Sequence, residues 1–220
     1  MTAQWSWLPQ LAQGLLLTLE ITAACIAFGA VLGALLACGR LFGRKWLRFL
    51  CGGYIRLFRG TPLLVQLAVL YFGLPSWGVV LPRVLCAILA LGLNSAAYQA
   101  EYFRGAIQAV APGQIAAARA LGLNRWKSIF TVIFPQAARL VIPSWSNELI
   151  LMLKYSSIVF SITLYDLMGM GKRIASRNFR YFEVFLIVAG IYLVVVLIVS
   201  VGLRALERRL RVPGLGSSNS

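Results

Sequence analysis

Long apolar runs separated by short polar segments dominate the chain, and five of them are long enough to span a membrane. The runs lie near residues 11–38, 61–79, 82–103, 128–153 and 182–203. A helix needs about 20 apolar residues to cross the hydrocarbon of a bilayer. The pattern therefore predicts an all-α membrane protein with about five transmembrane helices, which form a single transmembrane domain over residues 11–211.

Glycine and proline interrupt two of these runs. Gly73 and Pro75 fall in the second run, and Pro135 and Pro143 fall in the fourth, so a break or kink is expected in each. A further apolar piece, residues 158–170, is short and rich in glycine. It is expected to be a re-entrant or interfacial segment, and the placement of residues 155–181 stays open.

Composition agrees with this class. Hydrophobic residues make up 60% of the 220 positions and charged residues only 12%, whereas soluble domains carry about 25% charged residues. The formal net charge of +15 would point to nucleic acid in a soluble protein. In a membrane protein, basic residues gather in cytoplasmic loops, so no nucleic-acid partner is expected.

The distribution of basic residues predicts the orientation. Fifteen of them fall in three segments on one side of a five-span chain, at 40–59, 104–139 and 204–211. This side is expected to be cytoplasmic, with residues 1–10 outside and a flexible tail, 212–220, inside. A basic group on the outer side breaks the rule, and its members are Arg83, Lys172, Arg173, Arg177 and Arg180.

The sequence offers few residues that could form a catalytic or metal site. The chain has no histidine, and its four cysteines form no C-x-x-C pair, so neither a metal site nor a catalytic residue is expected. The nearest approach to a phosphate-binding loop, Gly169-Met170-Gly171-Lys172, lacks the required spacing. This chain is therefore expected to bind no ATP and no other cofactor, and to be no enzyme.

The polar segment 112–135, PGQIAAARALGLNRWKSIFTVIFP, has the pattern of a helix–turn–helix. Pro112 and Gly113 mark a turn, and the alanine-rich stretch 114–121 favours a helix. Gly122 can adopt the left-handed conformation that ends a helix, and Asn124 can cap the next one. The sequence therefore predicts a rigid elbow with a surface of small side chains.

Several motifs in order resemble one family over nearly the whole chain. They are RGTPLLVQL at 59–67, LNSAAYQAEYFRG at 93–105, the elbow at 112–135 and NELILMLKYSS at 147–157. Together they resemble the ABC transporter permease subunits of the polar amino-acid importers, which serve histidine, arginine, glutamine and opines. The elbow resembles the EAA coupling loop of this family.

The resemblance implies a type I importer fold and a set of partners. They are two ATPase subunits that hold ATP and magnesium, a second permease subunit (identical or paralogous), an extracytoplasmic solute-binding protein, and the bacterial inner membrane. The residues implied in ATPase coupling are Ala116, Ala117, Ala118, Arg119, Gly122 and Arg125. Ala116 stands where the family usually has glutamate, which puts the charge-assisted part of that contact in doubt.

Candidate solute-binding residues are polar groups in apolar runs. Glu148 and the adjacent Asn147 are the first choice and Gln66 the second, and a polar or cationic amino acid fits them. A bond to a neighbouring helix is the alternative for Glu148 and Gln66. Glu101 and Arg104 are expected to form an ion pair on one helix face. Glu20 is expected either to line the path or to bond across the subunit seam.

Two other functional classes remain as alternatives. A secondary transporter or channel would use an intramembrane carboxylate with an ion gradient, without an ATPase partner. An intramembrane enzyme would need histidine, a metal cluster or paired carboxylates, which the sequence does not offer. Co-purification with an ATPase separates the importer from the first alternative.

Overall fold

The computed structural model describes residues 7–210, apart from the side chains of Pro112 and Arg125, and within this range all regular structure is helical. Three helices are long and apolar enough to cross a membrane singly. They are α2 (Leu8–Phe42), α5 (Arg83–Ala109) and α11 (Tyr181–Leu210). They confirm the first, third and fifth predicted spans, and the predicted tail 212–220 lies outside the described residues.

Two bent segments complete the set of candidate spans. The first joins α3 (Lys45–Gly60) to the piece Leu63–Trp77 at an angle of 102°, and the second joins Ile142–Ile162 to α10 (Leu167–Asn178) at 48°. If each bent pair is one span, the described chain has up to five spans, the predicted number. The fourth candidate covers residues 142–178 instead of 128–153.

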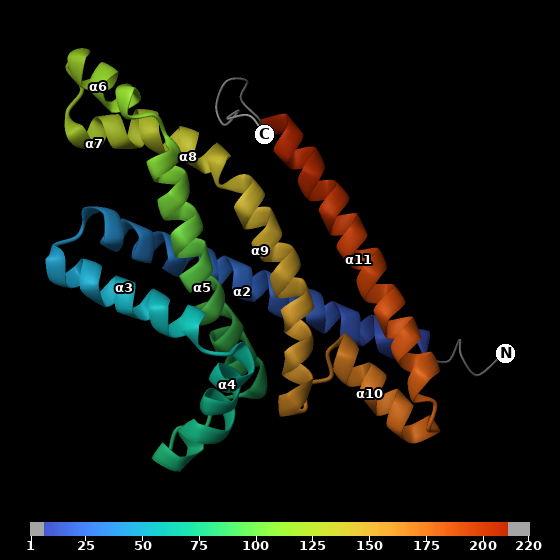
Figure 1. Cartoon of the computed structure of the whole chain (residues 1–220). Helices are drawn as coiled ribbons and strands as arrows, with labels where there is room; N and C mark the ends of the chain where they lie inside the picture. The colour runs from blue at the N-terminus through green and yellow to red at the C-terminus, as the bar shows by residue number, and fades with distance from the viewer. Residues whose placement is uncertain (1–6, 211–220) are drawn as a thin grey trace.

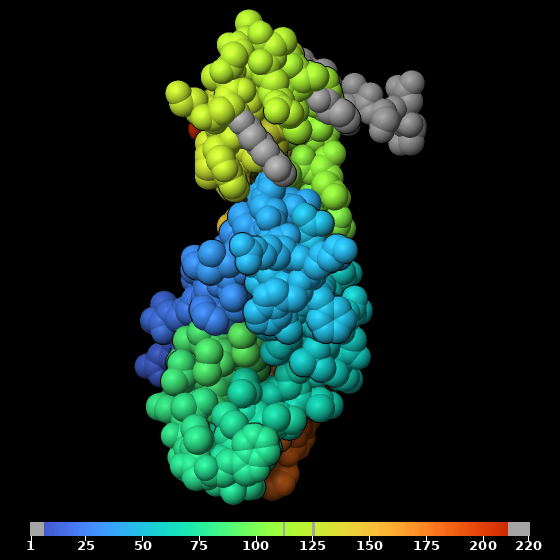
Figure 2. All heavy atoms as spheres, turned by 90° about the vertical axis from the view of Figure 1, so that its left-hand side faces the viewer, coloured from blue at the N-terminus to red at the C-terminus, as the bar shows by residue number. Residues whose placement is uncertain are grey.

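The helices place the two polar regions of the chain at opposite ends of the molecule (Figure 1). A hairpin of α6 (Pro112–Ala120) and α7 (Arg125–Ser128) lies at one end, here called the hairpin end. The last turns of α11 reach the same end, whereas α10 lies at the other, here called the α10 end (Figure 1). Figure 2 shows the hairpin projecting beyond the turn that joins α2 to α3.

Small residues let α2 and α5 pack closely in the middle of the molecule. A side chain at Gly33 of α2 would place its Cβ 3.0 Å from the carbonyl oxygen of Ala96, and one at Gly29 would lie 2.6 Å from Nε2 of Gln99. The facing positions of α5 include the buried Ala97 and Ala100. Because backbones approach closely only where side chains are small, this contact fixes the register of the two helices.

The region 40–59, predicted as a loop, is helical instead. Residues 45–60 form α3, whose buried positions Cys51, Gly52 and Ile55 lie on one face. The basic side chains Arg56 and Arg59 are exposed. The helix is amphipathic. The sequence suggested a loop because this segment carries several charges and the pair Gly52-Gly53.

Proline and glycine change the helix type where breaks were predicted. In the second span, α4 (Leu63–Ala68) continues as a π-helical turn, η1 (Val69–Gly73), and a 3-10 turn, η2 (Leu74–Trp77). After α7, a π-helical turn η3 (Ile129–Ile133) leads to α8 (Phe134–Leu140) and then to α9 (Ile142–Tyr155). Pro135 and Pro143 lie at the starts of α8 and α9, where the missing N–H of proline interrupts the helical hydrogen-bond ladder.

The segment 155–181, left open by the sequence, folds as a turn and a short helix. A 3-10 turn, η4 (Ser156–Ile162), ends at Thr163 in the left-handed conformation. Asp166 then caps α10, its carboxylate accepting from the backbone N–H groups of Met168 and Gly169 at 3.3 and 2.9 Å. The buried face of α10 packs on α2 and α11.

Candidate functional site

Glu148 is the centre of a buried polar cluster between α9 and α5. Its side chain is only 1% exposed. Oε1 accepts a hydrogen bond from the Ser95 hydroxyl at 2.7 Å, and Oε2 accepts one from the Tyr102 hydroxyl at 3.4 Å. Among the side chains that the structure describes, no Lys or Arg forms an ion pair with it. Both of its hydrogen-bond donors are therefore neutral hydroxyl groups.

A second layer of hydrogen bonds ties this cluster to α2. The amide of Gln99 donates to Ser95 Oγ at 3.0 Å and to the carbonyl oxygen of Ile26 at 3.3 Å. The indole of Trp145 in turn donates to Gln99 Oε1 at 3.0 Å. Since Gln99 is fully buried, these bonds fix its orientation and that of the Ser95 hydroxyl.

The sequence reasoning identified Glu148 but not its partners on α5. Ser95, Gln99 and Tyr102 lie four and three residues apart, so they share one face of the helix. Three polar residues at this spacing on one helix face are the signal that could have revealed them. Such a stripe predicts a polar face turned toward another helix or a solute path.

Arg59 brings a positive charge to the edge of this region. It lies in the last turn of α3, is exposed, and places its guanidinium carbon 4.9 Å from the ring centroid of Tyr98 on α5. Tyr98 lies one turn from both Ser95 and Tyr102 on that helix. A cation over an aromatic face is held electrostatically, so Arg59 has a defined position near the cluster.

Gln66 lies in the first turn of α4, beside the sharp corner between α3 and α4. Its amide nitrogen donates to the Phe58 carbonyl oxygen and to the Thr61 hydroxyl, both at 2.8 Å. Asn94 of α5 donates to the same Phe58 oxygen at 2.9 Å and to Gln66 Oε1 at 3.2 Å. The corner thus adjoins the Glu148 cluster, because Asn94 precedes Ser95, and the Gln66 amide satisfies carbonyl groups at the end of α3.

Asn147 lies outside the buried cluster although it precedes Glu148. It is exposed, and so is Lys154, which lies two turns further along the same face of α9. Pro143 lies in the first turn of α9, and the helix is regular at Glu148. The interruption expected near this residue therefore lies at the junction of α8 and α9.

The α6–α7 hairpin has the geometry expected of the elbow. Gly122 is left-handed with φ 82°. The Leu123 N–H donates to the Ala118 carbonyl and the Gly122 N–H to that of Arg119, which is the Schellman ending of a helix. Asn124 Oδ1 accepts from the Lys127 N–H at 2.8 Å and caps α7. The predictions for Gly122 and Asn124 are thus confirmed.

The predicted coupling residues differ in exposure. Ala116, Ala117, Arg119 and Gly122 are exposed, whereas Ala118 is buried. The side chain of Arg125 lies outside the described residues. The surface of the hairpin also presents Leu121, 83% exposed, and Trp126, 57% exposed. Apolar side chains of this size on a polar hairpin are typical of a contact surface for a protein partner.

An ion network links α2 and α5 near the hairpin end. Glu101 pairs with Arg104 on its own helix, Oε2 lying 2.7 Å from Nη2, and with Arg40 of α2 through its other oxygen. The expected pair of Glu101 and Arg104 is therefore confirmed, with a second arginine added. Glu20, in contrast, is exposed on α2, and no intrachain ion pair to it occurs within residues 7–210.

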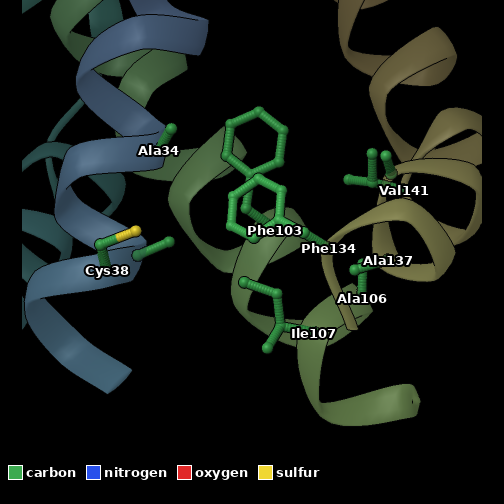
Figure 3. Close-up of a pocket in the computed structure, with 10 residues that line it drawn as sticks. Ala34, Cys38, Phe103, Ala106, Ile107, Phe134, Ala137 and Val141 are labelled. Atoms are coloured by element: carbon green, nitrogen blue, oxygen red, sulfur yellow. The ribbon is translucent and has the colours of Figure 1, made fainter. Parts of the chain in front are cut away.

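An apolar cavity of about 170 Å³ lies between α2, α5 and α8. Phe103 of α5 and Phe134 of α8 extend into it, and Ala34 and Cys38 of α2 lie across from them (Figure 3). Its lining offers no charged group and no hydroxyl or amide side chain. It is therefore unsuited to a polar solute, and the Glu148 cluster remains the candidate site.

Comparison with known proteins identifies the family. A family model described as "Binding-protein-dependent transport system inner membrane component" matches residues 29–212. The octopine transport system permease protein OccM of Rhizobium meliloti is 40% identical over 198 residues, covering 86% of this chain and 81% of the relative. The glutamine transport system permease protein GlnP of Escherichia coli is 36% identical over 213 residues, covering 96% and 97%.

A third relative, the histidine/lysine/arginine/ornithine permease protein HisM of Salmonella typhimurium, is 37% identical over 206 residues, covering 89% of this chain and 88% of the relative. The crystal structure of an amino acid ABC transporter with histidines superposes with a TM-score of 0.91 at 39% identity, over 94% of this chain and 97% of that one. The chain therefore belongs to the binding-protein-dependent transport system inner membrane components, and it is a permease subunit of an ABC importer.

Proposed function

We propose that this permease carries a polar amino acid, zwitterionic or cationic, along a path at the seam between two permease subunits. The two subunits are identical or paralogous, and each contributes a Glu148 cluster. The observation that carries this proposal is the buried Glu148 carboxylate, which accepts hydrogen bonds from two hydroxyl groups and forms no ion pair among the described side chains. A buried charge without an ion-pair partner is costly, and an incoming ammonium group would supply that partner.

Tyr102 offers a route by which the solute can reach Glu148. Its hydrogen bond is the longer of the two at 3.4 Å, and its ring is only partly buried. A solute ammonium group can therefore replace this hydroxyl while the shorter bond from Ser95 holds the carboxylate in place. In an ammonium–carboxylate bond both partners are charged, so it is stronger than the bond from the neutral tyrosine hydroxyl that it would replace.

Arg59 and Asn147 are suited to the rest of the solute. The Arg59 guanidinium rests on the Tyr98 ring, and its N–H groups are free to bind a carboxylate in two-pronged fashion. Asn147 is exposed on α9 beside Glu148 and can bond a polar side chain. The printed names of relatives, which include octopine, histidine, lysine, arginine, ornithine and glutamine, fit a solute with ammonium and carboxylate groups.

Energy would come from a separate pair of ATPase subunits docked on the α6–α7 hairpin at the cytoplasmic side. Exposed Leu121 and Trp126 supply apolar contact area there, and Gly122 keeps the elbow rigid. ATP binding would close the ATPases, move the hairpins, and switch the path from inward-facing to outward-facing. Hydrolysis would reset it, and an extracytoplasmic receptor would deliver the solute from the α10 end.

Uptake by reconstituted vesicles tests the role of Glu148. In Glu148→Gln, the apparent KM for a cationic amino acid is expected to rise about tenfold, the equivalent of about 1.4 kcal/mol. The assembled complex should still purify intact. Glu207→Gln, on α11, provides a control for the loss of one carboxylate. An unchanged KM at limiting solute would count against the site.

A gradient-driven carrier would use the same buried carboxylate for protons. Vesicles that contain the permease without its ATPase distinguish the two mechanisms. Under our proposal they accumulate no solute with either a proton or a sodium gradient. Accumulation at the full rate without the ATPase would overturn ATP coupling.

A further inference from the structure

The beginning of α3 is a surface segment that combines basic and aromatic side chains. This segment, here called the α3 start, comprises residues 44–50 with the sequence RKWLRFL, and all seven are exposed. Trp46 is 68% exposed and Phe49 70%. Only from Cys51 onward does α3 bury side chains against the rest of the chain. Apolar side chains this large and this exposed mark a surface that meets another molecule or a lipid.

The apolar and basic residues of α3 occupy different parts of its circumference. At about 100° per residue, Trp46, Phe49 and Leu50 fall on one face, and the exposed Leu57 extends that face by two turns. Ile55 lies on the opposite face and is buried. The basic residues of the α3 start lie beside the apolar face or behind it, and they are Arg44, Lys45 and Arg48. The outward face of the helix is therefore apolar and is bordered by positive charge.

The α3 start lies toward the hairpin end of the molecule. It follows directly on α2, and the ring centroid of Phe42, the last residue of α2, lies 6.1 Å from that of Trp126 in the hairpin. Arg48 holds the intervening turn, because its Nε donates to the Gly43 carbonyl oxygen at 2.8 Å. This bond leaves the two terminal nitrogens of its guanidinium for another acceptor. In the proposed orientation the hairpin end is cytoplasmic, so the segment lies at the inner leaflet.

The cations of the α3 start have no acidic residue near them in the sequence. No Asp or Glu occurs between Glu20 and Glu101, and Glu101 is already paired with Arg40 and Arg104. A symmetric contact with a second copy of this chain would bring like charges together. Charge complementarity therefore favours a partner that is both apolar and negatively charged.

We propose that the α3 start binds anionic phospholipid of the cytoplasmic leaflet. This inference rests on the orientation given in the proposed function. Arg44, Lys45 and Arg48 bind the headgroup phosphate, and Trp46 and Phe49 enter the boundary between headgroups and acyl chains. Helices that are basic on one side and carry Trp, Phe and Leu on the other lie in this interface. Bound lipid would also hold the end of α2, which contacts the hairpin.

Fluorescence quenching of Trp46 tests the proposal. The complex of permease and ATPase is placed in phosphatidylcholine nanodiscs that contain a minor fraction of lipid brominated on its acyl chains, either phosphatidylglycerol or phosphatidylcholine. Bromine quenches tryptophan on contact, and subtraction of the signal of Trp46→Phe isolates Trp46 from the other tryptophans. We expect the affinity at Trp46 to be about fivefold or more higher for phosphatidylglycerol, since each basic side chain near an anionic surface contributes about that factor.

Two double variants separate this site from the general charge of the cytoplasmic face. Arg44→Gln/Lys45→Gln should remove most of the preference for phosphatidylglycerol, while Trp46 still contacts lipid. Arg204→Gln/Arg208→Gln, in the last turns of α11 at the same end of the molecule, removes the same charge and should leave the preference unchanged. Equal rates of ATP hydrolysis in phosphatidylcholine show that both complexes are intact. An equal loss of preference in the two variants would overturn the site.

Two further outcomes would also overturn the proposal. Equal quenching of Trp46 by the two brominated lipids would show a lipid contact without preference for negative charge. Quenching by neither lipid would show that protein, such as the second permease subunit, covers the segment. The test measures lipid contact without transport, so these results leave the proposed function standing. Failure of the proposed function would instead appear as the absence of ATP-driven uptake by the unsubstituted complex.

Discussion

The hydroxyl of Ser95 donates to Glu148 across 2.7 Å, although the two residues lie 53 positions apart in the chain. This bond joins α5 to α9 inside the polar cluster. A hydrogen bond to a charged acceptor contributes about 1.5–3 kcal/mol. Ser95 is therefore expected to hold the carboxylate in the position from which it meets the solute.

Removal of this hydroxyl should weaken solute binding. In Ser95→Ala, the Glu148 carboxylate keeps only the longer bond from Tyr102, and its position is less restrained. We expect the KM for uptake to rise about 3–10-fold, with little change in maximal rate. Transport assays over a range of solute concentrations measure both. Ser157→Ala is a suitable control, since its hydroxyl bonds only within its own turn, to Lys154. An equal effect of the two changes would argue against the pairing.

A side chain at Gly122 should uncouple ATP hydrolysis from transport. The left-handed backbone at this position costs a β-branched residue more than 1 kcal/mol, so Gly122→Val should distort the elbow while the spans stay folded. We expect the stimulation of ATP hydrolysis by solute and receptor to be lost. Gly113→Val is the matched control, because open space surrounds both glycines and only Gly122 has a positive φ. Normal stimulation in Gly122→Val would reject the role of the elbow.

Close packing of α2 on α5 predicts a stability defect at Gly33. Its Cβ would already lie 3.0 Å from the Ala96 carbonyl oxygen, so Gly33→Val should force the helices apart. The expected loss of unfolding free energy is about 1–3 kcal/mol, which thermal unfolding in detergent can detect. Gly53→Val, in α3, places the same side chain in open space and should have a much smaller effect. Comparable melting temperatures for both variants would contradict the close contact.

Glu101 should stabilise the junction of α2 and α5 by pairing with two arginines. In Glu101→Gln, Arg40 and Arg104 lose their shared carboxylate, and we expect a loss of about 1 kcal/mol in unfolding free energy. The loss should be smaller at high salt. A double-mutant cycle with Arg40→Gln measures the part due to the pair across the two helices. A coupling energy of zero would show that the pair contributes no stability.

The sequence predicted the three long helices well because each contains a long apolar run, although α5 also carries polar residues in its second half. It failed at α3, where hydrophobic residues alternate with arginines and two glycines occur together. The helix there depends on the burial of Cys51, Gly52 and Ile55 against the rest of the chain, and such contacts are invisible in one sequence. Tertiary packing overrode the local loop signals.

The candidate site was likewise predictable from the sequence only in part. Glu148 was predictable because a carboxylate in an apolar run is costly and needs a reason. Its donors Ser95 and Tyr102 come from another helix 46 or more positions away, so they depend on the register of α5 and α9. Gln66 was found by the same argument as Glu148, yet the structure gives its amide a role in the α3–α4 corner.

The π-helical turn η3 lies between the hairpin and α8. A π-turn contains one residue more than an α-helical turn, so this stretch holds one residue that a regular α-helix would not need. If that residue were passed along the helix, the two flanking segments would turn relative to each other by about 100°, the angle that one residue occupies in an α-helix. Such a shift of the π-turn would convert a displacement of the hairpin into a rotation of α8 without stretching the chain.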